Sequence, residues 1–164
     1  MDSTINNRIY HVFTNTSGAN QYYNISGNNY YTFQNLPLSL GNGSVENIYL
    51  EDNVAAGGTW SQPYTINVSG YPLTVNLINT VTEKGISKTV TGIIYTDVIH
   101  ITTTLSVSLL GLPLPADAIA TNIEAFYARK VGMIQSKNKI SVNYAGNVTN
   151  IDTNTYLVQS DIIK

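Results

Sequence analysis

The chain has 164 residues, a formal net charge of −2, no cysteine and only 11% charged residues. The lack of cysteine excludes disulfides, iron–sulfur clusters and thiolate zinc sites, and the small net charge gives no electrostatic basis for binding nucleic acid or an anionic membrane. We expect a single all-β domain over residues 1–164, with residues 1–7 as a polar lead-in.

The composition favours β-structure. Asn, Thr, Tyr and Ser are abundant, whereas the strong helix formers Glu, Lys and Arg are scarce. β-branched and aromatic residues suit strands, and Asn, Gly and Ser suit the turns between them. No stretch approaches the roughly 20 apolar residues of a membrane-spanning helix. The composition therefore predicts little or no helix.

Short strands separated by turn-forming residues are expected in the first third of the chain. Residues 8–13 form the first, and two tyrosine-rich strands over residues 22–25 and 30–33 flank a Ser-Gly-Asn-Asn turn. Asn42-Gly43 is a strong hairpin signal that leads into a strand over residues 45–50.

The clearest hairpin joins residues 60–68 to residues 71–77. Apolar side chains alternate with polar ones on both sides of a two-residue turn at Ser69-Gly70. A second turn is expected at Glu83-Lys84-Gly85, before residues 87–90 lead into the next strand.

Residues 98–109 predict the longest strand, around which the others assemble. Ile, Leu and Val occupy the odd positions from Ile99 to Leu109 except Thr103, and His, Thr and Ser occupy the even positions, so one face is apolar and the other wet. Twelve extended residues span about 40 Å, and a strand of that length must twist and bend with its neighbours. Because consecutive strands usually pair, we expect a strongly curved antiparallel meander: a barrel, a half-barrel or a lipocalin-like sheet.

The last third of the chain continues the pattern. One helical turn is expected over residues 116–121, followed by a strand over residues 122–136 with a kink near Gly132. A turn at Lys137-Asn138 leads to strands over residues 139–144 and 155–162.

Catalytic groupings are weak. The two histidines, His11 and His100, are far apart in sequence, and His100 lies on the polar face of its strand. The motifs G-x-S-x-G and G-x-G-x-x-G are absent, as are a P-loop and a calcium loop. We therefore expect a non-enzymatic protein with no catalytic residues, no metal and no cofactor. The alternative is a hydrolase in which two of Asp97, Glu124 and His100 converge in one cleft.

Aromatic residues supply the candidate ligand-binding site. Twelve tyrosines, three phenylalanines and one tryptophan could form a stacking platform for sugars. The common alternative is that the rings pack on the sheet with their hydroxyls in water. The candidate residues are Tyr22, Tyr23, Tyr30, Tyr31 and Trp60.

Two segments carry a family resemblance. Residues 92–101 read G-I-I-Y-T-D-V-I-H-I, residues 126–134 read F-Y-A-R-K-V-G-M-I, and Gly58-Thr59-Trp60 lies upstream. Over residues 57–136 the chain resembles uncharacterised bacterial cell-envelope lipoprotein domains, whose motifs are G-x-x-Y-x-x-V-I and Y-A-K-G-V-G-L-I. Lys130 departs from the pattern, because the family usually has glycine there; Lys130 must either adopt a glycine-like conformation at some strain or alter the local geometry.

The resemblance implies an all-β domain of the bacterial cell envelope, periplasmic or surface-exposed. Its only membrane link would be a lipid anchor on a removed N-terminal segment. The leading functional hypothesis is a binding or scaffold domain whose partner is a small apolar molecule held in a curved sheet, or an envelope protein. The alternatives are binding of a glycan or surface polymer through exposed tyrosines, and the hydrolase described above.

Overall fold

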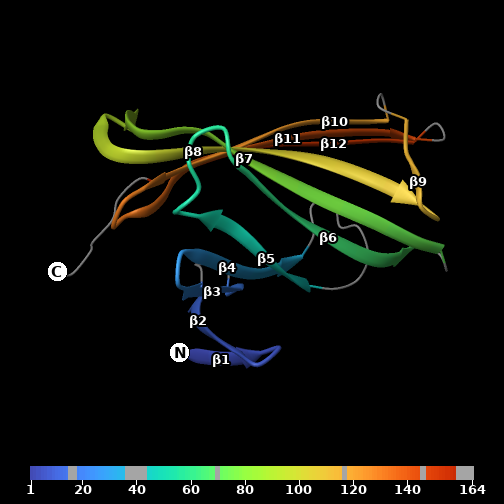
Figure 1. Ribbon diagram of the computed structural model, residues 1–164, viewed down its shortest axis with the longest axis horizontal. Helices are drawn as coiled ribbons and strands as arrows, with labels where there is room; N and C mark the ends of the chain where they lie inside the picture. Colours follow the sequence, from blue (N-terminus) through green and yellow to red (C-terminus); the bar gives the residue numbers. More distant parts are fainter. Residues whose placement is uncertain (15–17, 36–43, 69–70, 116–117, 145–146, 158–164) are drawn as a thin grey trace. The chain divides into compact units, whose positions relative to one another are not determined.

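The computed structural model describes residues 1–14, 18–35, 44–68, 71–115, 118–144 and 147–157 (Figure 1). Within these ranges the chain forms twelve strands and no helix, which confirms the expected all-β class. The part of the chain that the structure describes contains no helix able to span a membrane.

The chain is organised as two compact units, Met1–Asn53 and Val54–Lys164. Each unit contains one antiparallel sheet whose strands follow one another in a meander. Along the described strands neither sheet closes on itself or curls strongly, so the expected strongly curved meander (a barrel, a half-barrel or a lipocalin-like sheet) is not confirmed. The single-domain expectation stays a prediction.

The sheet of the first unit has five strands in chain order. They are β1 (Asp2–Ile5), β2 (Arg8–Thr14), β3 (Asn20–Ser26), β4 (Asn29–Asn35) and β5 (Ser44–Glu51). The expected polar lead-in therefore contains a strand, β1. Asn6 and Asn7 turn the chain into β2 with φ angles of 50° and 63°, because asparagine tolerates the left-handed conformation of a tight hairpin turn. The predicted hairpin turn at Asn42-Gly43 lies outside the described residues.

The sheet of the second unit has the order β12-β11-β10-β8-β7-β6, with the short β9 paired to β8. Its strands are β6 (Thr59–Val68), β7 (Tyr71–Val90), β8 (Ile93–Leu109), β9 (Leu112–Pro113), β10 (Ile119–Ala128), β11 (Gly132–Tyr144) and β12 (Asn147–Tyr156). The predicted hairpin of β6 and β7 is confirmed by its register from Thr59–Thr80 to Val68–Tyr71; its turn at residues 69–70 lies outside the described residues.

From Ile101 to Val107 the alternation along β8 sorts the side chains as the sequence predicts, whereas at the start of the predicted strand Val98 is fully buried and Ile99 and His100 are both only half-buried. Ile101, Leu105 and Val107 are buried, with 2%, 9% and 7% of their surface exposed. Thr104 and Ser106, between them, are exposed. Burial of the apolar face stabilises the strand by about 1.5–3 kcal/mol for each fully buried aliphatic side chain.

The predicted turn at Glu83-Lys84-Gly85 is wrong. β7 runs on to Val90, and the hairpin turns instead at residues 91–92. The pairing of this segment with β8 contains three register shifts, which leave single residues of β7 without a partner in the register. Gly85, within the segment, has a φ of 73°. A glycine in a strand permits such a bulge at little steric cost, so the turn-like residues produce irregular pairing within a continuous strand.

The predicted kink near Gly132 is a tight turn. β10 ends at Ala128, and the Val131 amide donates a 3.1 Å hydrogen bond to the Ala128 carbonyl. Lys130 has a φ of 64°, so it takes the left-handed conformation that glycine would adopt without strain. The turn expected at residues 137–138 is also wrong, because β11 continues through it.

The helical turn expected over residues 116–121 is wrong for the part of that segment within β10. Residues 119–121 pair with β11 as a strand, and residues 116–117 lie outside the described residues.

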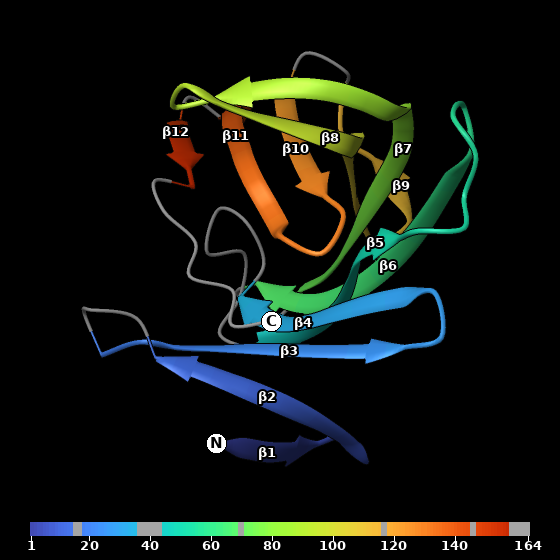
Figure 2. The ribbon, with the colours of Figure 1, turned by 90° about the vertical axis from the view of Figure 1, so that its left-hand side faces the viewer.

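A core cluster joins the hairpin of β7 and β8 to β10 and β11. Figure 2 shows β7 and β8 passing across β10 and β11, which brings the turn-proximal end of the hairpin over these strands. The buried members of the cluster are Val90, Tyr95, Val98, Phe126, Ala128 and Ile134. Val98 and Ile134 are fully buried, so this cluster ties the meander together at one end of the unit.

Candidate functional site

The tyrosine-rich sheet of the first unit has two chemically different faces. Successive strand residues point to opposite faces, so adjacent tyrosines are separated by the sheet. Tyr23 and Tyr30 lie on one face, and Tyr22 and Tyr31 lie on the other. Trp60 belongs to the second unit, on β6, and is 9% exposed. The structure therefore brings the five predicted ligand-binding residues together only in part.

Four aromatic rings form a continuous row on one face, which we call the ladder. Phe13 contacts Tyr23, Tyr23 contacts Tyr49, and Tyr49 contacts Tyr30, with ring centroids 5.9, 6.0 and 6.2 Å apart in edge-to-face geometry. Tyr23 and Tyr49 come from β3 and β5, with β4 between them. The small, buried Thr32 occupies β4 opposite Tyr23, so the two larger rings meet across it. Each such ring pair adds about 0.5–1.5 kcal/mol beyond its buried area.

Sequence reasoning missed Tyr49 and Phe13 as members of this row. Tyr49 is the extra residue at a register shift, since Tyr30 pairs with Leu50 and Tyr31 with Ile48. Thr32 pairs with Asn47, so alternation along β5 already places Tyr49, two residues further on, on the face of Tyr23, and the bulge shifts only its pairing with Tyr30. Only the pairing register could have revealed it.

Two of the ladder hydroxyls, those of Tyr23 and Tyr49, have raised pKa values. Burial, together with neighbouring Tyr23 and Tyr30, raises the pKa of Tyr49 to about 12, and burial also raises the pKa of Tyr23. The Tyr30 hydroxyl donates a 3.0 Å hydrogen bond to Asp52. Tyr23 and Tyr49 are therefore uncharged at physiological pH.

The opposite face holds a closed polar network around Glu46. Its carboxylate accepts hydrogen bonds from Arg8 Nε, at 3.1 Å, and from the fully buried Tyr10. The Arg8 guanidinium also donates to Asn24 and lies 3.5 Å from the centre of the Tyr31 ring. Burial and then the Glu46 hydrogen bond raise the pKa of Tyr10, so this hydroxyl keeps its proton.

Arg8 is the only arginine or lysine in residues 1–53, and its interactions determine the charge available for binding. Burial lowers the pKa of Arg8, but the hydrogen bond and negative charge of Glu46 outweigh that effect and leave it raised. The guanidinium thus stays charged and is held by Glu46. We conclude that this network stabilises the sheet.

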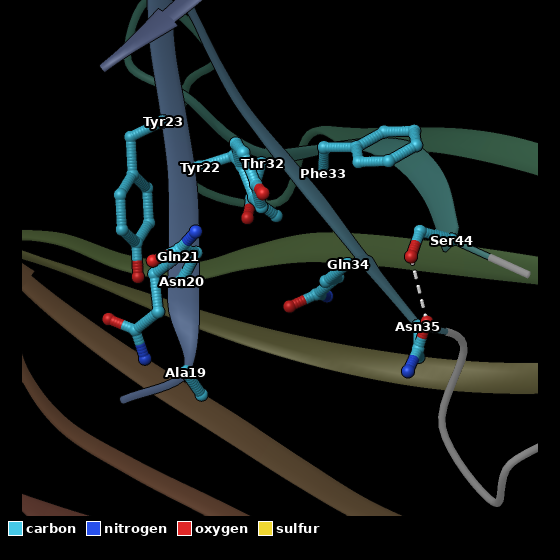
Figure 3. Close-up of a pocket in the computed structure, with 10 residues that line it drawn as sticks. All are labelled: Ala19, Asn20, Gln21, Tyr22, Tyr23, Thr32, Phe33, Gln34, Asn35 and Ser44. Atoms are coloured by element: carbon cyan, nitrogen blue, oxygen red, sulfur yellow. Dashed lines mark hydrogen bonds between the residues drawn. The ribbon is translucent and has the colours of Figure 1, made fainter. Parts of the chain in front are cut away.

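A cavity of about 310 Å³ opens where β3 and β4 separate (Figure 3). Pairing between these strands ends at Tyr22–Phe33, although both strands continue. Asn20 stays paired to β2 and Asn35 stays paired to β5, so each strand follows its outer neighbour. We call this cavity the fork. It is lined by Ala19, Asn20, Gln21, Tyr22, Tyr23, Thr32, Phe33, Gln34, Asn35 and Ser44.

The residues proposed for the hydrolase alternative lie in separate interactions of the second unit. His100 Nδ1 is 3.1 Å from Glu83 Oε2, and the His100 ring stacks on Phe126 with centroids 4.1 Å apart. Asp97 accepts a 3.2 Å hydrogen bond from Arg129. Glu124 lies opposite residues 102 and 137 in the register.

The environment of His100 does not resemble an accessible catalytic site. Its Nε2 atom is buried and has no hydrogen-bond partner in the described part of the chain. A general base must reach a proton on substrate or water, and a buried atom does not offer that access in this conformation. Among the described residues, no group of three or more His, Cys, Asp or Glu side chains is arranged to hold a metal ion.

Comparison of the chain with models of protein families, with curated proteins and with solved structures finds no match. The resemblance to cell-envelope lipoprotein domains therefore stays a prediction, and the ladder and the fork carry the functional argument.

Proposed function

We propose that the protein is a non-catalytic binding module of the bacterial cell envelope, and that its first unit binds a carbohydrate or surface polymer through the ladder. The observation that carries this proposal is the row of four rings in continuous edge-to-face contact on one sheet face. Phe13, at one end, is 59% exposed and offers a ring surface to a ligand. The apolar face of a sugar ring packs on such an aromatic surface while tyrosine hydroxyls bond its polar edge.

The charges of the unit favour an uncharged polymer. Arg8, the only basic side chain in residues 1–53 apart from His11, is bound by Glu46 on the face opposite the ladder. Binding of nucleic acid depends on neutralising phosphates with several free Lys or Arg side chains. A neutral glycan needs no such neutralisation.

The location follows from the family resemblance. We place the protein in the periplasm or on the cell surface, attached before processing through a lipid anchor on an N-terminal segment.

A second candidate is a scaffold with an apolar partner. Ile9 and Ile25 share the ladder face with Phe13 and are 58% and 63% exposed. An exposed apolar face suits an envelope protein, or a small apolar molecule held in a curved, lipocalin-like sheet. Extraction of the purified protein with organic solvent, followed by mass spectrometry, would detect a bound lipid and favour this candidate.

A glycan array tests the leading proposal directly. The full chain should bind neutral bacterial surface glycans, and Phe13→Ala should weaken binding about two- to tenfold, the range expected for loss of one aromatic contact. Tyr156→Ala is the matched control, because Tyr156 is a 45% exposed aromatic residue on β12 of the other unit. Absence of any glycan binding by the unmodified chain would refute the proposal.

A further inference from the structure

The fork directs backbone groups toward its interior. Alternate N–H and C=O groups of a strand point toward each neighbour, and an antiparallel partner normally pairs them. The backbone pairing of β3 with β4 includes no pair beyond Tyr22–Phe33. Residues 20–21 pair with β2 instead, and residues 34–35 pair with β5. The facing edges of β3 and β4 therefore present peptide donors and acceptors to the cavity between them.

Four amide side chains add to this hydrogen-bonding surface. Asn20 accepts a 2.8 Å hydrogen bond from Thr14 through Oδ1, and Asn35 accepts one of the same length from Ser44. In both residues the amide oxygen is engaged, so the NH₂ group supplies the remaining donors. Gln21 and Gln34 are exposed, and Figure 3 shows Gln34 projecting from β4 toward β3.

The lining combines this polarity with aromatic surface and no formal charge. None of the ten lining residues is acidic or basic. Phe13 is the register partner of Gln21, and Tyr23 belongs both to the ladder and to the fork. Amides beside an aromatic surface match a ring with hydroxyl groups at its edge and an apolar face.

The volume limits the size of the occupant. At about 30 Å³ per water molecule, 310 Å³ corresponds to about ten waters. Pockets for small ligands begin near about 300 Å³, so the fork holds one ring rather than a segment of polymer.

We infer that the fork is a subsite for a single neutral hexopyranose ring, whose hydroxyls are bound by Gln21 and Gln34 and whose apolar face lies toward Tyr23. This inference rests on the proposed carbohydrate binding and refines it. The ladder supplies contact area along the polymer, and the fork supplies selectivity for one sugar unit.

Nuclear magnetic resonance of the ¹⁵N-labelled full chain tests the subsite with methyl glycosides of glucose, galactose, mannose and N-acetylglucosamine. At least one should shift the side-chain amide signals of Gln21 and Gln34 and leave those of Asn122, an exposed amide on β10, unmoved. Gln21→Ala and Gln34→Ala should each lower the affinity for that glycoside about three- to tenfold, the effect of losing one hydrogen bond. Asn122→Ala should leave the affinity unchanged.

Gln21→Glu provides a second variant of nearly identical shape. It removes the two amide donors while preserving side-chain length, so it should weaken binding as the alanine variant does, and circular dichroism verifies the fold of each variant. If the chain binds neutral glycans on the array but the fork variants bind methyl glycosides as the unmodified chain does, the subsite is wrong and the proposed function stands. If the unmodified chain binds neither polymer nor glycoside, both are refuted.

Discussion

Lys130 stores conformational strain that a single substitution should release. It lies exposed in the turn between β10 and β11 with a φ of 64°. A side chain in this left-handed conformation crowds the following carbonyl oxygen, at a cost of about 1–2 kcal/mol that glycine avoids. Glycine offsets about 0.5–1 kcal/mol of this gain, because it is more flexible in the unfolded chain. We therefore expect Lys130→Gly to raise the free energy of unfolding by about 0.5–1 kcal/mol.

The only tryptophan in the chain makes the measurement specific. Trp60 is 9% exposed and lies in the same compact unit as Lys130, so its fluorescence during urea denaturation reports on the unfolding of that unit. Lys130→Ala is the matched control: it removes the charge but keeps Cβ and hence the strain, and its stability should equal that of the unmodified chain. An alanine variant as stable as the glycine variant would show that the charge, and not the backbone, is responsible.

The remaining predictions concern the two sheets. The folded-state pKa of Tyr49, about 12, exceeds its ordinary value of 10.0. The unfolded chain therefore loses this proton first, and the stabilisation present below pH 10 is lost as the pH rises toward 12. In thermal melts over that interval, the melting temperature of Tyr49→Phe should fall less steeply with pH than that of the unmodified chain. Glu46→Ala should lower the unfolding free energy by about 2–3 kcal/mol in circular-dichroism urea titrations, because Arg8 loses its charged partner, and an unchanged midpoint would contradict this role. Ile134→Ala truncates a core side chain and should lower the free energy of unfolding by about 2–5 kcal/mol. Ile94→Ala, at a residue that is 70% exposed, should lower it by at most about 0.5 kcal/mol. Both are measured by tryptophan fluorescence, and equal losses of unfolding free energy would refute the assignment of the core.

Local alternation was enough to predict most strands. Polar and apolar residues alternate along β8, and the structure buries Ile101, Leu105 and Val107 as that pattern requires. Turn residues were less informative, because their effect depends on the neighbouring strand. Glu83-Lys84-Gly85 has the composition of a turn, but β8 pairs with the residues on both sides of it, and the segment becomes a bulged part of β7.

The candidate site was harder to predict for a related reason. Tyrosine density pointed to the sheet that carries the ladder and the fork, but two adjacent tyrosines cannot share a face of it. The contact between Tyr23 and Tyr49 depends on the pairing register, which places the small residue Thr32 between them on the intervening strand. The fork arises where pairing stops while both strands continue, and composition does not encode that endpoint.

The attachment of Arg8 to Glu46 has a practical consequence for handling the protein. Counter-ions weaken associations that depend on exposed opposite charges, whereas contacts between uncharged groups are little affected. If the first unit binds neutral glycans as proposed, a glycan column loaded with this chain should retain it through a concentrated brine wash. Elution should require competition by free sugar.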